Sequence, residues 1–128
     1  MFTNNVLRIT PDPAKSKSLI ETANARMSFV KEHSLKESNV SFIFECLYAS
    51  LIEKLHAHAL IHGFKIMNHL CLGFYSKNIE RNDELFLMFE ECRIKRNELV
   101  YDGKRLKLET AMKVIVICEK LLKEIDKL

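Results

Sequence analysis

Apolar residues recur along most of the chain at spacings of three and four, and short polar or glycine-containing breaks divide them into five segments. Such spacing places the apolar side chains on one face of a helix. The pattern predicts helices over residues 13–33, 41–63, 64–77, 83–101 and 108–127. The third of these is shorter than the others, so the sequence indicates four long helices and one short one.

The breaks carry residues that are typical of helix boundaries. Asp12 can cap the first helix, and Pro13 suits its first position because the missing N–H loses no hydrogen bond there. Gly63 and Gly103 follow the second and fourth helices, where the left-handed conformation of a glycine often ends a helix. These residues support the boundaries that the apolar pattern indicates.

Residues 114–118 (VIVIC) are the one stretch that also suits a strand, because β-branched residues favour sheets. The flanking segments have high helix propensity and contain no glycine or proline, so we expect a helix. More than half of its surface is apolar, which predicts burial between several neighbours or at a homodimer interface. The expected fold is all-α: an antiparallel up-and-down four-helix bundle with an additional short helix, over residues 13–128, after an N-terminal arm at 1–12.

Composition narrows the class of protein further. The chain has 128 residues, 48% of them apolar and 29% charged, which is the balance of one soluble globular domain. Its longest run without a charged residue, 66–76, is far shorter than a membrane-spanning helix needs. The first residues show neither a basic leader nor a long apolar segment. We expect a cytoplasmic protein that does not enter a membrane.

The net charge of +3 is small, but it is unevenly distributed. Residues 78–91 carry an excess of acids, and residues 93–107 carry an excess of bases. A concentrated basic segment can face phosphates, while the alternative is an ordinary solvated helix end. The candidate phosphate-binding residues are Arg93, Lys95, Lys104, Arg105 and Lys107.

Histidines and cysteines are the residues that could hold a metal. His58 and His62 are four residues apart on the second predicted helix, and His69 or Glu53 could supply a third ligand. No H-E-x-x-H or C-x-x-C pattern is present, and the four cysteines are widely spaced among apolar neighbours. We expect a hydrogen-bonded histidine pair, buried thiols, and neither metal nor cofactor.

Arg96 occupies an unusual position, on or beside the apolar stripe of the fourth predicted helix. A guanidinium there needs a carboxylate, a second subunit or a phosphate as its partner. Asn97 and Tyr101 add hydrogen-bonding groups next to it. The alternative is that Arg96 extends to solvent or pairs with a glutamate on another helix.

Residues 96–103 (RNELVYDG), late in a long helix of a small helical bundle, resemble the signature segment of HEPN domains. The family's motif is an arginine, usually followed by a polar residue such as asparagine, and then a histidine after a short gap. The resemblance extends over residues 13–127 through the order and length of the helices. It implies a dimer in which the signature helices face each other across a cleft.

Active HEPN members are metal-independent RNases, in which the arginine stabilises charge on the phosphate and the histidine aids proton transfer from a ribose 2′-hydroxyl. Many members pair with a small nucleotidyltransferase as toxin and antitoxin, or serve as nucleotide-binding or regulatory subunits. The resemblance therefore implies RNA or nucleotide as ligand, a nucleotidyltransferase as partner, and Arg96 and Asn97 as site residues.

Tyr101 stands where the motif has its histidine, and no histidine follows it in the chain. A phenol is a poor general base at neutral pH, whereas an imidazole is well matched. We therefore expect binding with RNase activity weak or lost. The alternatives are an active endoribonuclease that uses Arg96, Asn97 and Tyr101, and a structural helical protein without enzymatic activity.

Overall fold

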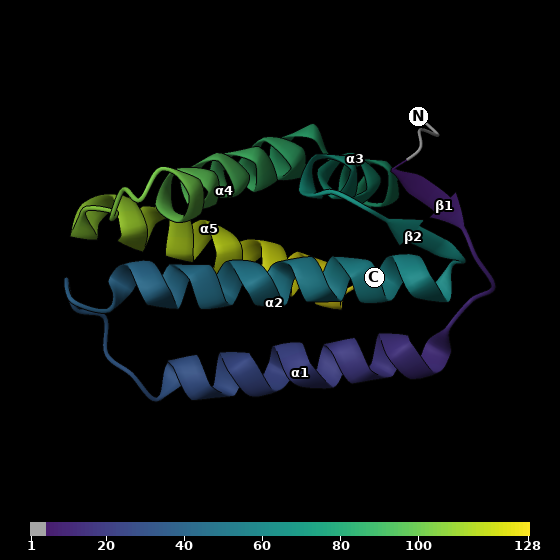
Figure 1. Ribbon diagram of the computed structural model, residues 1–128, viewed down its shortest axis with the longest axis horizontal. Helices are drawn as coiled ribbons and strands as arrows, with labels where there is room; N and C mark the ends of the chain where they lie inside the picture. The colour runs from purple at the N-terminus through teal and green to yellow at the C-terminus, as the bar shows by residue number, and fades with distance from the viewer. Residues whose placement is uncertain (1–4) are drawn as a thin grey trace.

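The computed structural model describes residues 5–128, apart from the side chain of Glu80. Residues 1–4 of the predicted arm lie outside the described residues. Within the described part, five helices surround a common core beside a very small sheet (Figure 1), which confirms the predicted helical bundle. The elements are β1 (Val6–Arg8), α1 (Pro13–Lys31), α2 (Val40–Ile61), β2 (Phe64–Ile66), α3 (His69–Glu80), α4 (Asp83–Tyr101) and α5 (Leu108–Asp126).

Local capping explains where the long helices begin and end. The Asp12 side chain accepts a hydrogen bond of 3.1 Å from the backbone N–H of Lys15, with Pro13 in the first position of α1. Asn82 caps α4 in the same way, since its side chain accepts hydrogen bonds from two backbone N–H groups of the first turn. Residues 114–118 lie within α5, so the helical interpretation of that stretch is confirmed.

The predicted start of the third helix, at residue 64, is wrong. β1 pairs antiparallel with β2, with Val6 opposite Ile66, and α3 begins only at His69. Gly63 adopts a positive φ of 83° and turns the chain, and its carbonyl accepts a hydrogen bond from the Ile9 N–H. The Asn68 side chain then caps α3. The pairing joins segments almost 60 residues apart, which a local apolar pattern does not reveal.

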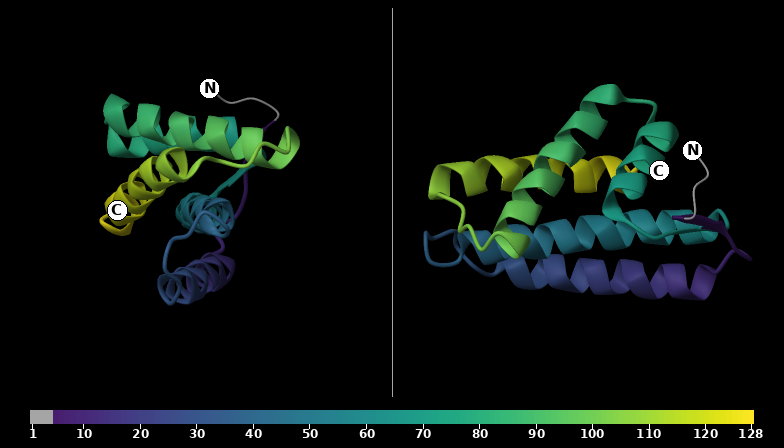
Figure 2. Two further views of the ribbon diagram at one scale, coloured as in Figure 1. Left: turned by 90° about the vertical axis from the view of Figure 1, so that its left-hand side faces the viewer. Right: turned by 45° about the horizontal axis from the view of Figure 1, so that its top comes forward.

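α2 is the central helix of the bundle. α1 packs along one side of it, while α4 and α5 lie on the opposite side (Figure 2). The long helices alternate in direction along the chain, so α2 and α5 run the same way as neighbours. At one end the Leu106 N–H donates to the Ser41 hydroxyl, and near the other end Lys54 pairs with Asp126 at 2.6 Å.

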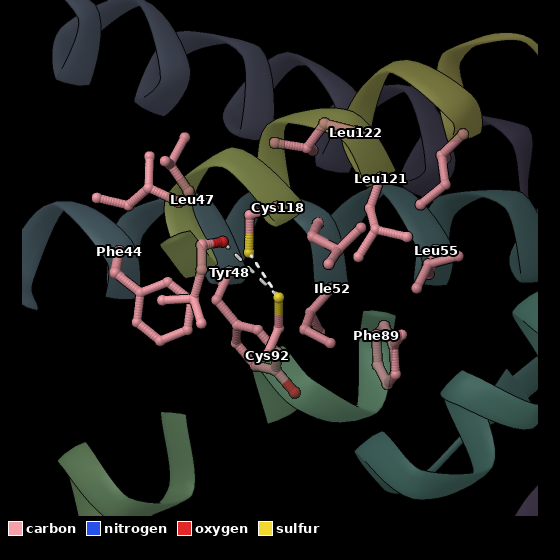
Figure 3. Close-up of a cluster of buried hydrophobic side chains, with 14 of the residues drawn as sticks. Phe44, Leu47, Tyr48, Ile52, Leu55, Phe89, Cys92, Cys118, Leu121 and Leu122 are labelled. Carbon is pink, nitrogen blue, oxygen red and sulfur yellow. Dashed lines mark hydrogen bonds between the residues drawn. The ribbon is translucent and has the colours of Figure 1, made fainter. Parts of the chain in front are cut away.

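The core lies where α2, α4 and α5 meet (Figure 3). Tyr48 and Phe44 of α2 pack there with Phe89 of α4. Cys92 and Cys118 join α4 to α5, with their sulfur atoms 3.4 Å apart. All four cysteines are free, and Cys71, Cys92 and Cys118 are buried as the sequence predicts, whereas Cys46 is only partly buried. None of the helices in residues 5–128 is long and apolar enough to cross a membrane.

Gly73 shows how closely α3 approaches α4. A Cβ atom at this position would lie 2.8 Å from two ring carbons of the buried Phe89. Gly73→Ala is therefore expected to lower the free energy of unfolding by about 1–3 kcal/mol, although alanine is the better helix former. Urea unfolding checks this, with Asn78→Ala at an exposed position of α3 as the matched control. A Gly73→Ala variant that is as stable as the wild type would contradict the close approach.

Candidate phosphate-binding site

Arg96 lies on the side of α4 that faces α2, close to the C-terminal end of the helix. Its guanidinium carbon is 5.6 Å from the centre of the Tyr48 ring and 5.6 Å from the centre of the Tyr101 ring. Tyr48 is 1% exposed and belongs to the core, whereas Tyr101 is 72% exposed. The two rings hold the cation by cation–π attraction at the edge of the core. The sequence prediction that Arg96 lies beside the apolar stripe is confirmed.

Arg96 forms no ion pair or hydrogen bond with any side chain that the structure describes. The neighbouring basic residues Arg93 and Lys95 each have a carboxylate partner. Arg93 donates two hydrogen bonds to Glu90, of 2.6 and 3.0 Å, and Lys95 lies 3.5 Å from Glu98. Because the guanidinium carries five N–H donors and is permanently charged, Arg96 retains its full capacity to bind an anion.

An open hollow of about 510 Å³ lies over this guanidinium. One wall comes from the junction of β2 and α3, and the other wall comes from the C-terminal half of α4. The lining residues are Met67, Asn68, His69, Leu70, Arg93, Arg96, Asn97 and Tyr101. The structure thus gathers Arg93 and the three motif residues into one site, which we call the Arg96 hollow.

His69, the first residue of α3, also lines the Arg96 hollow. Its Nδ1 atom is joined to the Tyr48 hydroxyl by a hydrogen bond of 3.0 Å. Partial burial, followed by the charge of Arg96, lowers the pKa of His69 to about 4, so its ring is neutral at pH 7. Sequence reasoning considered His69 only as a metal ligand. The contact with Tyr48 joins α3 to α2, and no local sequence motif indicates it.

The remaining predicted phosphate-binding residues lie elsewhere. Lys104, Arg105 and Lys107 are exposed in the loop between α4 and α5. Arg105 donates a hydrogen bond of 3.4 Å to the Ser38 carbonyl and, with Lys107, lines a second hollow. Lys95 does not line the Arg96 hollow. The basic segment is therefore divided between two surfaces.

The histidine pair at the end of α2 lies apart from the Arg96 hollow. The rings of His58 and His62 stack with their centres 4.4 Å apart, and His58 Nδ1 is 2.7 Å from the Tyr75 hydroxyl. Among the side chains described in residues 5–128, no group of three or more histidines, cysteines or acids is placed to hold a metal ion.

Three exposed apolar or aromatic side chains form a stripe along the outer side of α4. They are Leu87, Ile94 and Tyr101, spaced seven residues apart and 67%, 49% and 72% exposed. Seven residues correspond to about two helical turns, so the three side chains lie almost in line. The Arg96 hollow opens beside this stripe, since Tyr101 belongs to both.

The side chains that line the Arg96 hollow are suited to binding an anion. The hollow combines an unpaired guanidinium with the Asn97 amide and a neutral imidazole that is anchored at one nitrogen. These groups can donate several hydrogen bonds to phosphate oxygens. Comparison of the chain with protein-family models, with curated proteins and with solved structures finds no match.

Proposed function

We propose that this chain is a HEPN-type dimeric protein that binds an RNA or nucleotide phosphate in the Arg96 hollow. The observation that carries this proposal is the unpaired Arg96 guanidinium, held between Tyr48 and Tyr101 under an open hollow. A guanidinium with free donors matches the oxygens of a phosphate in a two-point contact. Because the hollow is open and no described carboxylate pairs with the guanidinium, its donors remain available to such a ligand.

The resemblance to HEPN domains supports the rest of the proposal. It makes a small nucleotidyltransferase the partner, with this chain as the toxin-like or regulatory subunit. RNase activity is weak or absent, because the phenol of Tyr101 occupies the position of the motif histidine. The second candidate function is an endoribonuclease that uses Arg96, Asn97 and Tyr101. The placement of the Arg96 guanidinium over the Tyr101 ring favours that candidate.

The dimer is supported by the stripe of Leu87, Ile94 and Tyr101 along the outer side of α4. If two copies of α4 pack antiparallel with Ile94 on the two-fold axis, Leu87 lies opposite the partner's Tyr101, so the exposed apolar and aromatic side chains cover one another. A surface that matches itself in this way suits a symmetric dimer.

Binding to single-stranded RNA at increasing salt concentration tests the proposed function. Each phosphate that the protein neutralises releases counterions, so the logarithm of the affinity falls by about 0.7 for each phosphate contacted per tenfold increase in salt. We expect a slope that corresponds to two or more phosphates, measured by fluorescence anisotropy. A methylphosphonate oligonucleotide of the same sequence, which lacks the backbone charge, is the control and is expected not to bind.

Two results would contradict the proposal. One is the absence of RNA binding at low salt, and the other is an affinity that does not change with salt. Either result would mean that the basic residues form an ordinary solvated surface, and it would favour a structural helical protein without enzymatic activity.

A further inference from the structure

We propose that His69 is a further phosphate ligand of the Arg96 hollow, and that its ring takes up a proton when the phosphate binds. The inference rests on the proposed function, since it requires a phosphate beside Arg96. It adds a residue from outside the helix that carries the signature segment. It also predicts a pH dependence that the arginines alone would not produce, because a guanidinium stays charged throughout the accessible pH range.

The geometry fixes His69 in the site. The Asn68 side chain accepts a hydrogen bond of 2.8 Å from the Cys71 N–H, which sets the start of α3 and with it the position of His69. The Tyr48 hydroxyl then holds Nδ1 of the ring at 3.0 Å. Nε2 has no partner among the described residues, so this nitrogen remains available to a ligand in the hollow that His69 lines.

The hydrogen bond with Tyr48 persists in either protonation state of His69. Burial raises the pKa of the Tyr48 phenol, so the hydroxyl keeps its proton. A hydroxyl both donates and accepts, and it can therefore donate to Nδ1 of the neutral ring or accept from the protonated ring. Protonation of His69 leaves this anchor in place and makes Nε2–H a charged donor, which is a stronger ligand for a phosphate oxygen.

Protonation of His69 and binding of the phosphate are coupled electrostatically. In the free protein, burial and then the charge of Arg96 hold the pKa of His69 low. A phosphate anion beside Arg96 offsets that positive charge and favours the imidazolium, so the pKa of His69 rises on binding. Because the bound state then holds more protons than the free state, the affinity increases as the pH falls from about 7.5 towards about 5.

The other charged and titratable groups near His69 do not account for such a dependence. Glu53 is held in an ion pair with Arg26. Burial, followed by the charge of Lys15, lowers the pKa of His56 as well, which favours its neutral form. The groups that face His69 or share a hollow with it are Glu45, Tyr48, Glu53 and His56 of α2 and Arg93, Arg96 and Tyr101 of α4.

The test measures the affinity of a short 2′-O-methyl oligoribonucleotide as a function of pH. The blocked 2′-oxygen prevents cleavage, and the charge of a phosphodiester does not change in this range. We expect the wild type to bind about tenfold more tightly at about pH 5 than at about pH 7.5. His69→Gln keeps a polar side chain beside Tyr48 but does not titrate, so its affinity is expected to vary by less than about twofold.

His33→Gln is the matched control, because His33 is exposed near the end of α1, where its ring bonds to the Phe29 carbonyl. This variant should keep the pH dependence of the wild type. In the wild type itself, the pKa of His69 followed by NMR should rise when the oligonucleotide is added. That second measurement holds even if His69→Gln folds poorly.

The outcomes separate the inference from the proposed function. Binding that shows the same pH dependence in the wild type and in His69→Gln, or an unchanged pKa of His69 in the complex, overturns the inference and leaves phosphate binding by Arg96 in place. An oligonucleotide that does not bind at either pH contradicts the proposed function itself.

Discussion

The Ile94→Asp variant is expected to be a monomer at concentrations at which the wild type is a dimer. Ile94 is half exposed in the middle of the α4 stripe, and the proposed two-fold axis passes beside it. The substitution would place two carboxylates against each other in the centre of the interface, where burying an unpaired charge is most unfavourable. We expect the dimerisation constant to weaken by more than about a hundredfold, measured by analytical ultracentrifugation.

Two variants make this experiment specific to α4. Val116→Asp changes an exposed apolar residue of α5, which is 64% exposed, and should leave the dimer intact. Leu87→Asp should weaken the dimer as well, because Leu87 is 67% exposed and lies opposite the partner's Tyr101 in the proposed packing. A monomeric wild type would contradict the dimer, and monomers produced by Val116→Asp alone would place the interface on α5.

The Arg96→Met variant is expected to lose RNA affinity by about thirtyfold or more. The substitution removes a two-point, charge-assisted contact with phosphate, which contributes about 2–3 kcal/mol. Methionine retains an apolar stem of similar length beside Tyr48, and Arg96 has no described carboxylate partner that the change would leave unpaired. The fold should therefore be kept, as circular dichroism and thermal unfolding can verify.

Lys120→Met is the matched control for Arg96→Met. It removes one positive charge from an exposed position of α5 and gives the same net charge. We expect its RNA affinity to stay within about threefold of the wild type, because salt screens the interaction between RNA and one distant charge. Equal losses of RNA affinity in the two variants would mean that binding depends only on net charge, and Arg96 would then have no particular role.

Local sequence signals predicted most of the fold. The spacing of apolar residues located all five helices, and Asp12 and Pro13 placed the start of α1 correctly. High helix propensity on both sides of residues 114–118 outweighed their β-branched content. The same spacing placed Arg96 beside the apolar stripe of α4. Each of these signals acts within a few residues of the chain, and it can therefore be read without knowledge of the fold.

Contacts between distant segments could not be predicted in this way. β1 and β2 are three residues long each, and their pairing depends on the turn at Gly63 and on the path of the whole of α2 between them. The contacts within the Arg96 hollow could not be predicted for the same reason. His69 reaches the Arg96 hollow because α3 folds back against α2 and α4, and nothing in the neighbouring sequence connects it with Tyr48.

The most direct test of phosphate binding in the Arg96 hollow is an NMR titration of the protein with single-stranded RNA, observing the backbone amides and the arginine Nε–H groups. We expect the largest changes at Arg96 Nε–H and at the amides of the residues that line the hollow, which are 67–70, 93, 96, 97 and 101. Changes confined to the loop that carries Lys104, Arg105 and Lys107, with the Arg96 signal unmoved, would contradict it.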